Sequence, residues 1–344
     1  MIRAQRPLSR LAFTLVELLV VLAIIAILVA LTTAGVLAIM KKGPATVATH
    51  EIGQLDTAIQ NFKTAYKVDY IPSRLFLAEG LGEYTGRPND PLAQESLAYL
   101  VRVWPQLTAP GGPWSQPPSS RLPGVPQFID WNGNGKLDSG VVLEGDQCLV
   151  FFLGGIPIQG TPAGCAGFST DPRDPSKVVN IPTGLPAPNN IYPAQTANRK
   201  GPFFEFPSDR LYQRDMLFLT NPTVSNYPIP FYSYADAHSN KSQKTPYAYF
   251  SSYGVRNGYN KYGSSDCPTL FYRPPVAPST AGIPIQPYFE APGRYLNPTG
   301  HQIISAGADA LWGPGGQWST LTTDSIAIEG RDDQSNFYGR LLGN

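Results

Sequence analysis

The chain has 344 residues, of which 42% are hydrophobic and 15% charged, and this composition excludes a disordered chain and suits a folded core. Its 33 glycines and 35 prolines indicate many turns and long loops. The 26 basic residues nearly balance the 25 acidic ones, and three of the arginines lie in residues 1–12. The remainder has no basic excess of the kind that nucleic-acid binding draws on, so we expect no nucleic-acid partner.

The N-terminus begins with a short basic segment, residues 1–12, and residues 18–40 then contain no charged side chain. As a helix this apolar run would extend about 34 Å, against a hydrocarbon core of about 30 Å. The run is longer than the apolar region of an ordinary secretory signal peptide. The arginines orient residues 1–12 toward the cytoplasm. We therefore predict a single membrane span, with the rest of the chain exported.

A carboxylate stands at the start of the apolar run, where an acidic side chain is costly and commonly functional. The sequence Ala-Phe-Thr-Leu-Val-Glu at residues 12–17 resembles the prepilin peptidase site of type IV pilins and type II secretion pseudopilins. The resemblance implies cleavage between Ala12 and Phe13, methylation of the new amine, and an assembly role for Glu17 against the amine of a neighbouring subunit. Ala12 departs from the family's usual glycine but keeps a small side chain.

The same resemblance implies the partners and the location of the chain. Prepilin peptidase would process it, and copies of itself and other pilin-like subunits would surround it in a helical filament. Before assembly it would lie in the bacterial inner membrane as a single-pass protein, with its C-terminal domain outside the cytoplasm. Residues 13–40 would then serve both as membrane span and as filament core.

After the span, Lys-Lys-Gly-Pro at residues 41–44 interrupts the apolar run, and Pro44 suits the first turn of a restarting helix. We predict a kinked helix from about Phe13 to about Tyr66. Its second half, residues 41–67, is expected to lay one apolar stripe on a globular domain. The residues of this stripe recur at helical spacing and are Ile52, Leu55, Ala58, Ile59, Phe62, Ala65 and Tyr66.

Residues 68–226 show no strong helical period, and we predict a loop-rich insertion of loops and short strands there. One motif stands out within it, with side-chain oxygens at the first, third, fifth and ninth positions and glycine at the sixth. Calcium loops use this arrangement, and the candidate ligands are Asp130, Asn132, Asn134 and Asp138. The usual acid at the twelfth position is replaced by Val141, which disfavours a full EF-hand. The alternative is an ordinary turn, since Asn, Asp and Gly also favour turns.

The three cysteines have neither CxxC spacing nor a neighbouring histidine cluster, which argues against a metal–thiolate site. An exported chain is exposed to oxidising conditions, so we predict one disulfide. Cys148 with Cys165 is the expected pair because it closes the shortest loop, and Cys267 would remain a buried thiol.

Residues 227–344 are rich in tyrosine at alternating positions, which predicts antiparallel strands. Three of its segments resemble, in order, the end of the major pseudopilin: residues 245–249, 304–309 and 332–337. In that family the middle segment belongs to a calcium loop. The resemblance therefore implies calcium ligands at Asp309, Asp332 and Asp333.

The sequence as a whole predicts an α+β fold, in which the long N-terminal helix packs on a C-terminal antiparallel β-sheet domain. Its predicted function is that of a structural subunit of a type II secretion pseudopilus. A type IV pilin for adhesion, motility or DNA uptake is the alternative within the superfamily. A membrane-anchored enzyme is a third hypothesis, and it is disfavoured because the three histidines are far apart and no nucleophile, phosphate-loop or metalloprotease motif occurs.

Overall fold

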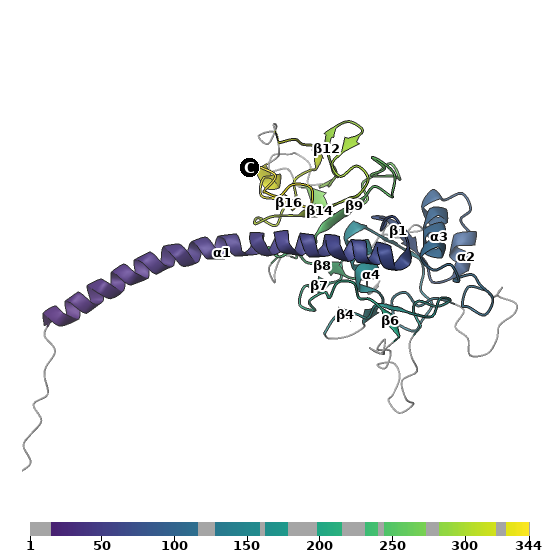
Figure 1. Ribbon diagram of the computed structural model, residues 1–344, viewed down its shortest axis with the longest axis horizontal. Coiled ribbons are helices and arrows are strands. Elements are labelled where there is room, and N and C mark those ends of the chain that lie inside the picture. The colour runs from purple at the N-terminus through teal and green to yellow at the C-terminus, as the bar shows by residue number, and fades with distance from the viewer. Residues whose placement is uncertain are drawn as a thin grey trace, which may run out of the picture.

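A long helix and a mixed α+β domain make up the computed structural model, and Figure 1 shows the helix projecting from the domain. The structure describes residues 15–115, 128–158, 162–177, 198–214, 231–239, 244–272, 282–320 and 328–343. Their helices are α1 Leu15–Tyr66, α2 Leu81–Thr85, α3 Pro91–Val103, α4 Gly145–Gly154 and the 3₁₀ turn η2 Ile328–Gly330. The strands are β1 Leu75–Leu77, β2 Val141–Leu143, β3 Pro157–Ile158, β4 Gly164–Cys165, β5 Phe168–Ser169, β6 Arg199–Lys200, β7 Leu211–Tyr212, β8 Ser233–Tyr234, β9 Ala248–Ser251, β10 Phe271–Tyr272, β11 Ile283–Pro284, β12 Tyr288–Ala291, β13 Arg294–Tyr295, β14 His301–Ser305, β15 Gly316–Gln317 and β16 Gln334–Ser335. This architecture confirms the predicted α+β class.

Helix α1 is one continuous element of 52 residues that runs through Pro44 without a break. The predicted course of the helix to about Tyr66 is therefore confirmed, whereas the kink predicted at residues 41–44 is wrong, because Figure 1 shows a gradual bend along the helix. A proline inside a helix removes one backbone donor and crowds the preceding turn, which bends the helix where it does not end it.

The apolar stripe predicted on the second half of α1 is confirmed as its packing face. Ile52, Leu55 and Phe62 are buried in the main hydrophobic core, whereas the intervening Gln54 and Thr57 are exposed. This face contacts α4 and β16. At the β16 contact, Gln334 Nε2 donates to the carbonyl oxygen of Ala45, 3.0 Å away, and to Thr49 Oγ1, 2.9 Å away. The second half of α1 is thus an integral part of the domain.

The described part of the region 68–226 contains the helices α2, α3 and α4, so the expectation of loops and short strands alone was wrong. Helix α3 starts with a standard cap, in which Asp90 accepts from the backbone N–H groups of Leu92 and Ala93 and Pro91 follows at the first turn. Every residue of α4 is buried. A helix buried on all sides shows no apolar period, and α4 therefore could not be recognised from spacing.

The strands form small sheets whose named pairs are antiparallel, apart from β12 with β15. In the sheet β16–β14–β9, Ile304 pairs with Ala248 on one side and with Ser335 on the other. The three segments that resemble the major pseudopilin therefore lie on adjacent strands of one sheet. In a second sheet β1 pairs with β2, with Leu77 opposite Val141.

A buried carboxylate, Asp266, ties the chain after α1 to the C-terminal part of the domain. Its Oδ2 accepts from Ser73 Oγ at 2.7 Å and from Tyr253 Oη at 3.0 Å, while its Oδ1 is buried without a hydrogen-bond partner. Burial raises the pKa of Asp266 to about 6. The folded chain therefore keeps this proton at pH values where the unfolded chain, with a carboxyl pKa of about 3.9, has lost it.

We expect Asp266 to make the unfolding free energy fall by about 2 kcal/mol as the pH rises from 4 to 7, because the stabilisation by the bound proton is present below the unfolded pKa of about 3.9 and is lost as the pH rises through the folded pKa of about 6. Asp266→Asn, which is neutral throughout, should remove this part of the pH dependence. Denaturant unfolding of both proteins at several pH values measures the difference. Parallel stability profiles for the two proteins would contradict the expectation.

Candidate functional site

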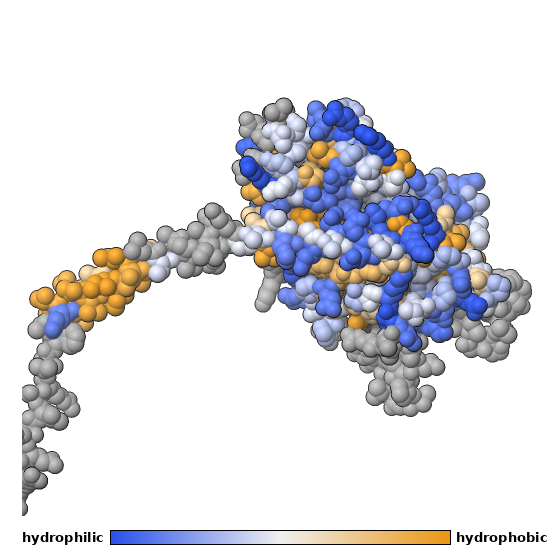
Figure 2. All heavy atoms as spheres, viewed as in Figure 1, coloured by the Kyte–Doolittle hydropathy of each residue, from blue (hydrophilic) through white to orange (hydrophobic). Residues whose placement is uncertain are grey.

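The N-terminal site combines one acid with an exposed apolar helix surface. The predicted processing residues Ala12 and Phe13 lie outside the described residues, whereas Glu17 lies in the first turn of α1 and is exposed. Figure 2 shows apolar side chains covering the projecting end of α1, away from the domain. The exposed ones are Leu15, Val16, Leu18, Leu19, Val20, Val21, Leu22, Ile24, Ile25, Ile27, Leu28 and Val29. A surface of this kind marks contact with lipid or with other protein.

Among the residues whose side chains are described, no helix has the length and apolar character needed to cross a membrane. Within the predicted span, residues 18–40, the side chains of residues 31 and 33–40 are not among those described. Membrane insertion of this segment stays a prediction.

The predicted calcium ligands of the 130–138 loop are brought together. Asp130 Oδ1 accepts from the backbone N–H of Asn134 at 3.0 Å, and its Oδ2 accepts from that of Gly135 at 2.7 Å. Asp138 Oδ2 accepts from the side-chain amides of both Asn132 and Asn134. The adjoining Trp131 is fully buried and donates through Nε1 to the carbonyl oxygen of Ala78, 3.0 Å away, which anchors the loop to the core.

Glu79 joins this loop from outside it, and the sequence analysis missed it. The β1–β2 pairing ends at Leu77 opposite Val141, which places the residues after β1 beside the residues before β2. Glu79 Oε2 consequently accepts from the backbone N–H of Asp138 at 2.7 Å. Burial raises the pKa of Glu79 to about 8, and the negative charges of Asp130 and Asp138 add to the increase. No local pattern marks Glu79, because its position depends on strand pairing.

The three C-terminal acids, Asp309, Asp332 and Asp333, are also brought to one place, at the end of β14 and the start of β16. Two of them accept hydrogen bonds from backbone N–H groups. Asp332 Oδ2 accepts from the N–H groups of Ala308 and Asp309, and Asp333 Oδ2 accepts from that of Gly313. Burial raises the pKa of Asp309 to about 6 and that of Asp333 well above its usual range. Within the described ranges, no three side chains of His, Cys, Asp or Glu are gathered as a group that could hold a metal ion. Calcium binding at this site stays a prediction.

All three cysteines are free thiols in the structure, so the predicted disulfide between Cys148 and Cys165 is not formed. Cys148 lies in the first half of α4, whereas Cys165 packs against Gly154 at the other end of that helix. Six residues of helix separate the two positions by about 9 Å, and a disulfide requires Cα atoms within about 7 Å. Burial raises the pKa of each thiol, which makes all three unreactive.

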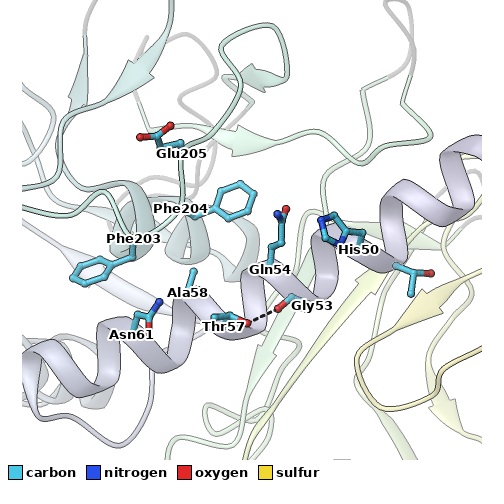
Figure 3. A pocket seen from close by; sticks show the side chains of 10 residues that line it. His50, Gly53, Gln54, Thr57, Ala58, Asn61, Phe203, Phe204 and Glu205 are labelled. Atoms are coloured by element: carbon cyan, nitrogen blue, oxygen red, sulfur yellow. Dashed lines mark hydrogen bonds between the residues drawn. The ribbon is translucent and has the colours of Figure 1, made fainter.

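A groove of about 610 Å³ lies along the outer face of α1, and Figure 3 shows the side chains that line it. They are Thr49, His50, Gly53, Gln54, Thr57, Ala58, Asn61, Phe203, Phe204 and Glu205. His50 and Glu205 are the titratable members of this lining, and Figure 3 shows them on opposite sides of the groove. These lining residues therefore do not include a nucleophile beside a base, the arrangement from which an active site would be argued.

Residues 9–33 match a family model described as the prokaryotic N-terminal methylation motif. Comparison of the whole chain with curated proteins and with solved structures gives no match. The family match confirms the resemblance at residues 12–17 and implies processing by prepilin peptidase. Proteins with this motif are typically structural subunits rather than enzymes, and they are targeted to the membrane. The chain thus carries, in its N-terminal segment, the prepilin-type cleavage and methylation motif of the pilin-like proteins.

Proposed function

We propose that this chain is a structural subunit of a type II secretion pseudopilus, assembled through the projecting end of α1. The observation that carries the proposal is the exposed apolar surface of residues 15–29, which begins beside Glu17. This surface is covered by lipid before assembly and by the helices of neighbouring copies after it. Burial of apolar surface contributes about 25 cal/mol per Å², so packing of such helices supplies the main drive for assembly.

The choice of a pseudopilus over a surface pilus rests on the C-terminal sheet. The three segments that resemble the major pseudopilin occur in the same order along this chain, and they form β9, β14 and β16. This sheet rests directly on α1 through Gln334. A resemblance that coincides with one structural unit is stronger support than scattered matches of the same length.

Glu17→Ala is expected to be inserted and cut between Ala12 and Phe13 but to fail in filament assembly. A carboxylate in an apolar surround costs about 2.5 to 3.5 kcal/mol, and pairing with the Phe13 amine of a neighbouring copy offsets this cost. The change should be made in the source cell. Mass spectrometry then reports the mature N-terminus, sheared filaments report assembly, and the medium reports secreted proteins.

Glu17→Gln is the matched variant, because it removes the charge and keeps the side-chain size, and it should fail like Glu17→Ala. Thr32→Ala is the control: Thr32 is exposed on α1, and its Oγ1 is bonded to the helix's own backbone at Leu28. Wild-type assembly by Glu17→Gln would refute the charge-pairing account. Normal secretion together with lost motility or DNA uptake would favour a type IV pilin instead.

A further inference from the structure

We propose that Glu79 completes a calcium site in the 130–138 loop, supplying the acidic ligand that the twelfth position of the loop lacks. The twelfth position is Val141, which is buried as the first residue of β2. Its opposite neighbour in the β1–β2 pair is Leu77, two residues before Glu79. The strand pairing that takes the twelfth residue into the core therefore also delivers a carboxylate to the loop.

The state of the Glu79 side chain is the observation that points to a ligand. Glu79 is 4% exposed, and its Oε2 is held by the N–H of Asp138. The backbone N–H of Asn132 also faces the carboxylate, but Oε1 is buried without a hydrogen bond of ordinary geometry. An unpaired carboxylate oxygen in the interior is costly, and native proteins rarely leave one without a compensating group. A cation at the loop would supply that group.

The loop side of the site offers the oxygens that a hard cation selects. Asp130 and Asp138 contribute carboxylates, Asn132 and Asn134 contribute amide oxygens, and calcium takes six to eight such ligands. The binding of Asp130 to the N–H groups of Asn134 and Gly135 wraps the loop around its first residue. Gly133 and Gly135 have φ of 72° and 74°, a conformation that glycine adopts without strain.

Asp138 is bonded within the loop itself. Two amide N–H groups, from Asn132 and Asn134, converge on the single oxygen Asp138 Oδ2. With Asp138 bonded to the two amides, the carboxylates of Glu79, Asp130 and Asp138 do not form a cluster that could hold a metal ion in this arrangement. Displacement of the two amide nitrogens releases Asp138 to the cation. Asn132 Oδ1 and Asn134 Oδ1 accept from the backbone N–H groups of Asn134 and Lys136, and each oxygen keeps a second lone pair for the cation.

The test uses the full-length protein in detergent micelles, stripped with chelator and titrated with calcium chloride by calorimetry. All proteins carry Asp309→Asn, so that the C-terminal acids do not contribute. On this background we expect calcium to bind and to raise the melting temperature, and magnesium chloride to do so far more weakly. Adding Glu79→Gln should weaken calcium binding by about tenfold or more, since removing a charged ligand shifts affinity on this scale.

Glu79→Gln keeps the acceptor for Asp138 and replaces a buried carboxyl group by a neutral amide of the same size, so its melting temperature in chelator should equal or exceed that of the parent. Asn132→Asp adds a carboxylate at the third position and should tighten calcium binding, which provides a second test if Glu79→Gln fails to fold. Three results would each overturn the proposal: no calcium binding by the stripped parent, unchanged affinity in Glu79→Gln, or unchanged affinity in Asn132→Asp.

Discussion

Arg214→Met should lower the unfolding free energy by about 3 to 5 kcal/mol, because it leaves two buried carboxylates without their cation. The side chains of Glu144 and Asp146 are each 1% exposed, and both are bonded to the guanidinium of Arg214. Asp146 also accepts from Ser233 Oγ, and Glu144 from Thr269 Oγ1. Burial raises the pKa of Glu144 even in the presence of the arginine. Removal of Arg214 therefore disturbs the start of α4 and both segments that are bonded there.

Denaturant unfolding of the full-length protein in detergent measures this loss. Arg102→Met is the matched control, because Arg102 pairs with Asp69 at the surface, where the two side chains are 48% and 70% exposed. Exposed pairs contribute about 0 to 1 kcal/mol, so this variant should unfold almost as the wild type does. Arg214→Lys keeps the charge but not the planar fork and should fall between the two. Equal losses for Arg214→Met and Arg102→Met would show that burial of the pair is irrelevant.

Glu51→Ala is expected to cost about 3 to 5 kcal/mol and to loosen α1 from the domain, because Arg210 is left without its carboxylate in a largely buried position. Glu51 is 9% exposed and accepts from Arg210, from Tyr234 Oη at 3.1 Å and from Tyr247 Oη at 2.7 Å. The Arg210 guanidinium also lies 4.4 Å from the centre of the Tyr234 ring. One residue of α1 thus gathers donors from three separate segments of the domain.

Hydrogen exchange separates loosening of α1 from general destabilisation. In Glu51→Ala the backbone amides of residues 48–62 should exchange faster than those of α3, whose main contacts are with β1 and α2. His50→Ala, at the exposed neighbouring position, should leave both rates unchanged. If α1 and α3 lose protection together, Glu51 stabilises the domain as a whole and does not serve as the specific attachment of the helix.

The elements that could be predicted from the sequence are those whose cause is local. The stripe from Ile52 to Phe62 follows the helical period because one face of α1 is buried and the other is exposed. The capped start of α3 at Asp90 was also readable, since the cap and the following proline are adjacent in sequence, but it was missed. Helix α4 gave no periodic signal, because all its faces are buried.

The candidate calcium site likewise has a part that could be predicted from local sequence and a part that could not. Its loop residues were found because their spacing is itself the requirement for wrapping a cation. Glu79 was not found, because the β1–β2 pairing brings it to the loop, and strand pairing leaves no trace at either residue. The predicted Cys148–Cys165 disulfide failed for the related reason that a short loop in sequence says nothing about the helix that separates its ends.

The unbroken course of α1 has a mechanical consequence. A helix of 52 residues is about 78 Å long, and it joins the exposed apolar end to the core of the domain without a hinge. A pull along this axis therefore reaches the domain as shear between α1 and the sheet. The helix is bonded to the domain where it enters it, at residues 45–51. Gln334 bonds Ala45 and Thr49 there, and Arg210 pairs with Glu51 about one turn further on. These contacts would bear the load first. The buried part of α1 after residue 51 would be loaded only once they had broken.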